Sequence, residues 1–175
     1  MVRSWLVAGL VTGLAAVVIL HETDLLQKIV HRKLPVRVEP MRRVRGWKEV
    51  AATVEAQRQK LLVEGKPVFI IGHHFGITGL LSFYLPEAKA AVRDTPLVYF
   101  RTTEHPQNQF YFWPGYREQR RGQNAIFVAM NTEIEAPPPS LVAEFSEVRD
   151  LGLFPVMQGG RVLHTVQIFV CRDLR

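Results

Sequence analysis

The 175-residue chain has one cysteine and none of the short motifs that mark the common enzyme classes. Cys171 has no partner within the chain for a disulfide, so cysteine usage fits a reducing or an oxidising compartment equally well. Gly-x-Ser-x-Gly, His-Glu-x-x-His, the Gly-x-Gly-x-x-Gly fingerprint and a Gly-Lys-Ser/Thr phosphate loop are all missing. These absences argue against serine hydrolases, zinc peptidases and nucleotide-binding enzymes that carry such motifs. We therefore predict no catalytic residue, no metal site and no cofactor.

Charge is missing from the start of the chain, because residues 4–21 contain no Asp, Glu, Lys or Arg. As a helix, residues 5–20 would be roughly 24 Å long at about 1.5 Å per residue, somewhat short of the roughly 30 Å of a bilayer core. We predict a membrane helix with its extension over residues 1–34. A cleaved signal peptide is an alternative, although no small-x-small cleavage site follows Leu20. A buried core helix is the third interpretation.

Positive charge dominates the composition, with 22 Lys and Arg against 16 Asp and Glu. Much of the excess follows the apolar run, so residues 35–45 are predicted to form a basic juxtamembrane linker. No aromatic side chain is interleaved with the cations of residues 28–45, which favours membrane lipid headgroups as the partner and argues against nucleic acid. Taken alone, the positive-inside rule would place this side of the helix in the cytoplasm. The cations concerned are Lys28, Arg32, Lys33, Arg37, Arg42, Arg43, Arg45 and Lys48.

Residues 46–175 have the pattern of one soluble α/β domain. Apolar side chains recur every three or four residues over residues 46–62, which predicts a helix with Trp47, Val50 and Val54 on the face toward the sheet. Short runs that are apolar at every position are typical of parallel strands buried on both faces. We expect such strands at residues 68–71, 97–100 and 125–130, and short helices at residues 78–84 and at residues 141–145, the latter capped by Ser140.

The C-terminal part predicts an antiparallel hairpin. Strand-like residues 148–156 and 161–170 flank Gly159 and Gly160. Pro155 indicates that the first of these strands is an edge strand or is bulged. The predicted fold class is α/β, with one N-terminal transmembrane helix followed by a small α/β domain. Its sheet is mixed, with a parallel part and the C-terminal antiparallel hairpin.

Polar side chains gather where the predicted parallel strands end, and ligands of open α/β sheets bind at these carboxyl ends. His73 and His74 follow the first strand, and Arg101 directly follows the second. Residues 108–116 then concentrate amides and aromatic rings, which suit a carbohydrate or an amphipathic interface. We predict a ligand-binding surface made of His73, His74, Arg101, Asn108, Gln109 and Trp113.

The same residues have other interpretations. Adjacent histidines on an extended turn point to opposite sides, so a zinc site would need help from a further ligand such as His105. The two histidines could equally be ordinary loop residues. The aromatic side chains Phe110, Phe112 and Trp113 could belong to the core or pack against the membrane surface.

Two segments of the domain are distinctive: the Phe-Tyr-Leu-Pro run of residues 83–86, and the Asn-Gln-aromatic run that ends in Trp113. Together with residues 45–49, 67–70 and 122–128, they resemble the C-terminal region of bacterial membrane glycosyltransferases. These are GT-C fold enzymes related to the dolichyl-phosphate-mannose protein mannosyltransferases, often grouped as family 39. The apolar run stands where the last transmembrane helix of such a protein precedes its soluble domain.

The resemblance implies an extracytoplasmic domain on the bacterial inner (plasma) membrane, near a polyprenyl-phosphate sugar donor. The catalytic acidic residues of that family lie in an early extracytoplasmic loop of a many-helix part, and this chain has no such loop. The resemblance therefore implies a truncated or split C-terminal piece, with the remaining transmembrane part of the parent enzyme as partner and no sugar transfer by the chain alone. In a many-helix parent, earlier helices constrain the last one, so a cationic extracytoplasmic linker is tolerated.

One alternative belongs to another class of protein. The chain would then be a non-enzymatic single-pass membrane protein whose α/β domain binds a protein partner or lipid headgroups. Its basic juxtamembrane residues would make the contact with the membrane.

Overall fold

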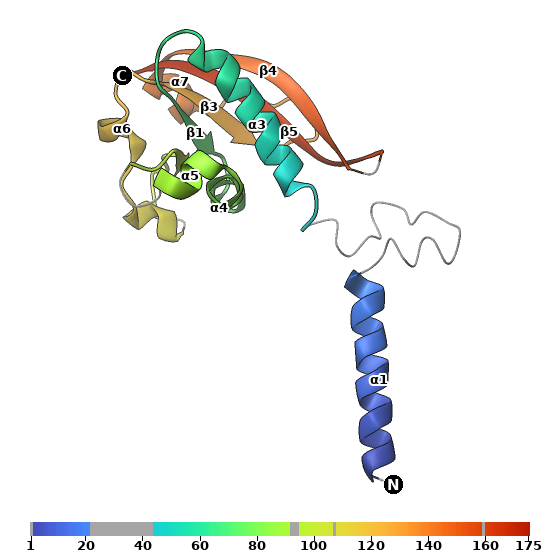
Figure 1. Cartoon of the computed structure of the whole chain (residues 1–175). Helices are drawn as coiled ribbons and strands as arrows, with labels where there is room; N and C mark the ends of the chain where they lie inside the picture. Colours follow the sequence, from blue (N-terminus) through green and yellow to red (C-terminus); the bar gives the residue numbers. More distant parts are fainter. Residues whose placement is uncertain (1, 22–43, 92–94, 107, 159) are drawn as a thin grey trace. The chain divides into compact units, whose positions relative to one another are not determined.

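The computed structural model describes residues 2–21, 44–91, 95–106, 108–158 and 160–175. The chain divides into two compact units, Met1–Arg45 and Gly46–Arg175, and the second is called the domain below. Figure 1 shows the helices and strands of both units. The predicted extension of the membrane helix and most of the predicted basic linker, including all of their cations up to Arg43, lie outside the described residues.

Helix α1 (Val2–His21) is the only element described in the first unit. Its window Val2–Ile19 has a mean hydropathy of 1.9 and is 0% buried. Within the described residues it is the one helix long and apolar enough to cross a membrane, a property that signal sequences share.

The domain is built on one mixed sheet of five strands in the order β2-β1-β3-β5-β4. Strands β1, β2 and β3 are parallel, whereas β5 runs antiparallel to both β3 and β4. The strands are β1 (Val68–Gly72), β2 (Val98–Phe100), β3 (Asn124–Ala129), β4 (Phe145–Gln158) and β5 (Arg161–Leu174). The predicted α/β class with a mixed sheet is therefore confirmed.

Helices cover both faces of this sheet because strand β1 is apolar on both faces. Val68 and Ile70 belong to one core together with Val50 and Val54 of α3, whereas Phe69 and Ile71 belong to a second core with Tyr116 of α6. The first core is covered by α3 (Trp47–Leu62), α4 (Phe75–Tyr84) and α5 (Pro86–Ala91). The second is covered by α6 (Tyr116–Gln119) and α7 (Pro139–Glu144), and the 3-10 helix η2 (Gln109–Phe112) lies between β2 and α6 in the chain.

The structure corrects two predicted helix boundaries. Helix α4 begins at Phe75, three residues before the predicted Thr78, because the side chain of His74 caps its first turn. Ser140 does not cap α7: the residue at the N-cap is Pro138, and Pro139 occupies the first turn. Proline is favoured there because its fixed φ suits a helix and its missing N–H would have no helical partner.

The C-terminal hairpin is confirmed and is longer than predicted. Strand β4 is the edge strand, as Pro155 indicated, and its pairing with β5 shifts register between Asp150 and Leu153 and again between Val156 and Met157. Beyond the last pair of β3 with β5, Ala129 with Gln167, the hairpin continues without a third strand. Figure 1 shows its tip extending past β3 on the side where α3 begins.

Candidate functional site

The carboxyl ends of the three parallel strands lie level with one another, because Gly72 pairs with Phe100 in β2 and with Val128 in β3. The first residue after each of two strands continues the ladder through its backbone. The N–H of His73 donates to the carbonyl of Val128 at 2.9 Å, and the N–H of Arg101 donates to the carbonyl of Gly72 at 3.1 Å. The predicted residues His73 and Arg101 are thus held side by side by the sheet. We call this side of the domain the carboxyl edge.

Gly72 lets helix α4 approach this edge closely. A Cβ at position 72 would lie 2.3 Å from Oγ1 of Thr78 and 3.0 Å from its backbone nitrogen. Any side chain here would have to displace the first turns of α4, whose start is fixed by Nδ1 of His74 accepting from the N–H of Gly76 at 3.1 Å. Glycine at the end of β1 is therefore what allows the strand, turn and helix to pack as they do.

A groove lies at the carboxyl edge beside the end of β2, and we call it the Arg101 groove. It consists of two adjoining hollows of about 340 and 710 Å³ that share Arg101, Thr102, Thr103 and Arg117. Aromatic side chains form one wall and the start of α7 forms another. The other lining residues are Phe100, Phe110, Tyr111, Trp113, Gly115, Tyr116 and Glu118 in the smaller hollow, and Glu104, His105, Pro138, Pro139 and Ser140 in the larger.

Two buried nitrogens at this edge have no hydrogen-bond partner within the described part of the chain, Nδ1 of His73 and Nε of Arg101. Burial lowers the pKa of His73, and the positive charge of Arg101 lowers it further. Glu135 acts in the opposite direction and His74 in the same direction as Arg101. His73 is therefore mainly neutral at pH 7, and the permanent positive charges of the groove are Arg101 and Arg117, of which Arg117 is paired with Glu144.

Beneath the groove lies a chain of polar side chains that fixes its floor. The hydroxyl of Thr102 donates to Tyr116 Oη at 3.0 Å, and Tyr116 in turn donates to the carboxylate of Glu144. Nε of Arg117 donates to the same carboxylate at 2.9 Å. Tyr116 and Glu144 are buried, and burial, followed by the charge of Glu144, raises the pKa of Tyr116. This network ties β2, α6 and α7 together, so the cations above it have a rigid support.

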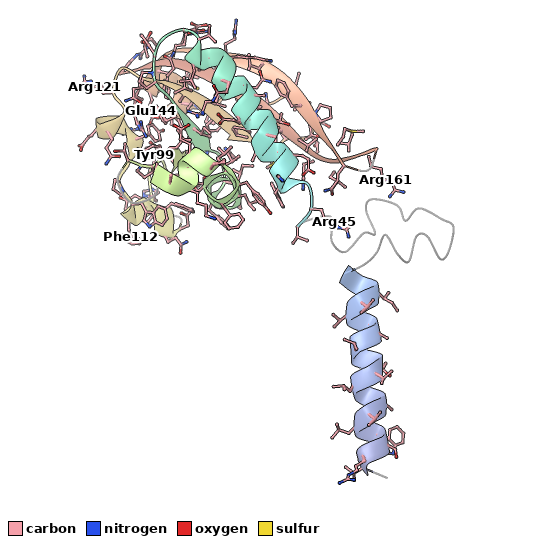
Figure 2. All side chains as sticks on the ribbon, viewed as in Figure 1. Arg45, Tyr99, Phe112, Arg121, Glu144 and Arg161 are labelled. Atoms are coloured by element: carbon pink, nitrogen blue, oxygen red, sulfur yellow. The ribbon has the colours of Figure 1, made fainter. Side chains whose placement is uncertain are left out.

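The aromatic wall comes from η2 and the residue after it. The ring of Phe110 stacks on Phe100 with centroids 6.1 Å apart and meets Trp113 edge-on at 4.8 Å. Trp113 and Tyr111 are half exposed, and Phe112 is 82% exposed. In Figure 2, Phe112 is labelled at the margin of the domain. The interpretation of Phe112 and Trp113 as core residues is therefore wrong, because both rings are exposed.

The remaining predicted site residues are placed less directly at the groove. His74 is exposed and caps α4, and Asn108 caps η2, with its side-chain oxygen accepting from the N–H of Phe110 at 3.0 Å. Gln109 is exposed at the start of η2 and does not line either hollow. Of the six predicted residues, Arg101 and Trp113 line the groove, and His73 lies next to Arg101.

A zinc site that uses His105 finds no support in the described residues, where no three His, Cys, Asp or Glu side chains lie close enough to hold a metal ion. His105 lines the larger hollow, whereas His73 and His74 follow β1. The hydroxyl of Thr103 instead donates to the carbonyl of His105 at 2.9 Å, which shapes the loop locally.

Sequence reasoning missed Thr102, Arg117 and Glu144, and it included Tyr116 only as an aromatic residue of the segment 108–116. Their contacts join residues 14, 27 and 28 positions apart in the chain, which no local pattern reveals. One signal was available: the sequence Trp113-Pro114-Gly115-Tyr116-Arg117 begins a helix directly after a loop that was already assigned to the site. Proline and glycine before Tyr116 indicate a turn, so the residues that follow it can lie close to that loop.

We expect the stability of the domain to fall as pH drops below 6.5, the ordinary pKa of histidine. The unfolded chain takes up a proton on His73 from that pH downward, whereas the folded domain resists it because the pKa of His73 is lowered by burial and by Arg101. Stability therefore decreases until the folded pKa is passed. Urea denaturation of the full chain from pH 7.5 to 5, compared with His73→Gln, measures this. An unchanged pH profile in the variant would contradict it.

Comparisons of this chain with protein-family models, with curated proteins and with solved structures each find no match. The chemistry of the Arg101 groove is therefore the observation that points to a ligand. Its lining combines permanent cations, hydroxyls and aromatic faces. Cations and hydroxyls suit phosphate oxygens, and aromatic faces suit the apolar faces of sugar rings.

Proposed function

We propose that the protein is the membrane-anchored, extracytoplasmic domain of a polyprenyl-phosphate-sugar-dependent glycosyltransferase of the bacterial inner membrane. Its role is to bind the sugar phosphate of the lipid-linked donor in the Arg101 groove, for a catalytic transmembrane part of the enzyme. The resemblance of residues 45–49, 67–70, 83–86, 108–113 and 122–128 suggests the family. Helix α1, long and apolar enough to cross a membrane, supports placement at a bilayer, where a lipid-linked donor resides.

The observation that carries the proposal is the juxtaposition of Arg101 with Trp113 in one groove. Arg101 is a partly buried cation whose Nε lacks a partner in the described part of the chain, so a phosphate oxygen can take that hydrogen bond. Trp113 and Tyr111 line the same hollow of about 340 Å³. That is at the lower end of the range of volumes, roughly 300 to 1,000 Å³, in which proteins bind small ligands. A single sugar phosphate matches it in size and chemistry.

A binding role without catalysis agrees with the carboxylates around the groove. Glu144 already accepts hydrogen bonds from Tyr116 and Arg117, so its carboxylate has a structural role and is not free to act as a base. Glu104 and Glu118 are exposed on the rim of the groove, where solvent surrounds their carboxylates. A glycosyl transfer needs a carboxylate placed at the acceptor, which the resemblance assigns to another part of the enzyme.

The test is a titration of the full chain in lipid nanodiscs with a short-chain prenyl-phosphate hexose, followed through backbone amide shifts. We expect the largest shifts at Arg101, Thr102, Thr103 and Trp113, with saturation at one site. Prenyl phosphate without the sugar should move the amides next to Arg101 and leave Trp113 largely unmoved. Shifts confined to the hairpin tip around Gly160, or no saturable shift, would contradict the proposal.

Turnover is the second measurement. We expect no detectable release of sugar from the prenyl-phosphate hexose by the purified chain, with or without a peptide acceptor. The physical reason is that the groove provides binding groups but no base held against an acceptor. Any turnover that grows in proportion to protein concentration would show that the chain is itself an enzyme.

A further inference from the structure

Many of the large exposed apolar side chains of the domain lie in segments that follow the carboxyl ends of the parallel strands. Phe75 follows β1, Phe112 follows β2, and Met130 and Ile134 follow β3. Phe83 and Tyr84 at the end of α4 and Val142 in α7 are exposed elsewhere. Since these strands end level with one another, their following loops lie along the same carboxyl edge. Surface loops are usually polar, but the loops at this edge expose large apolar side chains to solvent.

The hairpin adds to the same edge. Strand β5 runs antiparallel to β3, so the tip of the hairpin between Gln158 and Arg161 projects past the carboxyl end of β3. Met157 and Val162, which pair with each other next to the tip, are both exposed. The tip therefore offers two further apolar side chains beyond the carboxyl end of β3.

The opposite edge, where the parallel strands begin, has a different character. It carries ion pairs: Lys66 with Asp173, and Arg172 with both Glu64 at 2.7 Å and Glu147 at 2.9 Å. Val63 is the main exposed apolar side chain beside them, at the end of α3. The end where the parallel strands begin thus carries paired charges, whereas the carboxyl edge combines exposed apolar and aromatic side chains with the charged residues of the Arg101 groove.

The chain also enters the domain at the carboxyl edge. Helix α3 leads to the start of β1 through the short turn 63–67, so the first residue of α3 lies at the carboxyl edge. Its contacts agree, because the ring of Trp47 stacks on His164 of the hairpin at 4.3 Å, and Nε2 of Gln158 donates to Glu49 at 3.3 Å. The segment that arrives from α1 is therefore attached to the same end of the domain that carries the apolar side chains.

We infer that the carboxyl edge rests on the lipid bilayer, with Phe112 and the hairpin tip inserted at the level of the headgroups. Lipid fits better than a protein partner because the apolar side chains stand on separate loops with polar residues between them. A fluid lipid bilayer can accommodate side chains on separate loops, whereas a protein partner would need a surface complementary in shape to all of them. Trp113 and Tyr111, with apolar rings and polar tips, are the residue types enriched at that depth. The inference depends on α1 as the anchor and not on sugar binding.

The test places a spin label at three exposed positions of the full chain, one variant at a time: Phe112→Cys, Met157→Cys and the matched control Val63→Cys. Phe112 and Val63 are 82% and 87% exposed, so neither substitution disturbs the core. Cys171 is fully buried and should not react under native conditions. Each variant is reconstituted at one chain per nanodisc of phosphatidylethanolamine and phosphatidylglycerol. Collision rates are then measured with molecular oxygen, which enters lipid, and with a water-soluble nickel chelate.

We expect the ratio of oxygen to nickel collisions to be several-fold higher at positions 112 and 157 than at position 63. Equal ratios at all three positions would overturn the inference, because the carboxyl edge would then be in water. Protection of position 112 that rises with the number of chains per nanodisc would overturn it too, since a second copy would be covering the edge. No sugar is present, so the result is independent of the proposed function.

Discussion

Val54→Asp is expected to lower the free energy of unfolding of the domain by about 3 kcal/mol or more, because it places an unpaired carboxylate in a dry core. Val54 is 0% exposed and packs in one cluster with Val50, Val68 and Ile70, between α3 and the sheet. The buried cation on the same face of α3, Arg58, is already paired with Glu55 and Glu87. Urea denaturation of the full chain in nanodiscs, followed by far-ultraviolet circular dichroism, measures the effect.

Ala52→Asp is the matched control for this experiment. It introduces the same carboxylate in the same helix, two residues earlier, at an exposed position. Surface substitutions of this kind usually change stability by less than about 0.5 kcal/mol. If the two variants unfold at the same urea concentration, α3 does not pack on the sheet through the face that contains Val54.

The larger elements of the domain could be predicted because each is specified by a local pattern. Helix α3 shows apolar side chains at a helical period, and the core strands β1 and β3 are apolar at every position because both faces are buried. Elements without such a pattern were missed. Helices α5 and α6 and the 3-10 helix η2 are four to six residues long, too short to repeat any period.

Only those parts of the candidate site that directly follow adjacent parallel strands could be predicted from the sequence. Arg101 and His73 were placed together because residues that follow adjacent parallel strands meet at one edge, and the ladder at Gly72 confirms this geometry. Asn108 and His74 were chosen as ligand-binding residues for their polar chemistry, but each spends a side-chain acceptor on capping a helix. Capping and ligand binding use the same residue types, so the sequence alone does not separate them.

Helix α7 shows how tertiary contacts decide a site. No sequence pattern marks Glu144 as part of a site. In the structure it is buried and accepts hydrogen bonds from Tyr116 and Arg117 of α6. A buried carboxylate needs such partners, and they come from a helix that follows β2. The floor of the Arg101 groove therefore depends on contacts between elements that are distant in the sequence.

Arg101→Met is expected to weaken binding of the prenyl-phosphate hexose about ten- to a hundred-fold, because a charge-assisted hydrogen bond contributes about 1.5–3 kcal/mol. The side chain lines both hollows of the groove, and the methionine keeps its length while removing charge and donors. Arg121→Met is the matched control. Arg121 is exposed just before β3 begins, at the end of the domain opposite the groove, and its label in Figure 2 is well separated from that of Phe112.

The comparison between the two arginines separates a bound phosphate from a general attraction to positive charge. Both variants lose one unit of charge from the same domain, so a non-specific effect on an anionic ligand would weaken binding equally in both and would decline with added salt. A groove-bound phosphate predicts a loss in Arg101→Met alone, with unchanged urea midpoints in both variants. Arg101→Lys should recover part of the affinity, since it restores the charge but not the planar fork of donors. If Arg101→Met and Arg121→Met bind the prenyl-phosphate hexose with equal affinity, the proposal that the sugar phosphate binds in the Arg101 groove is wrong.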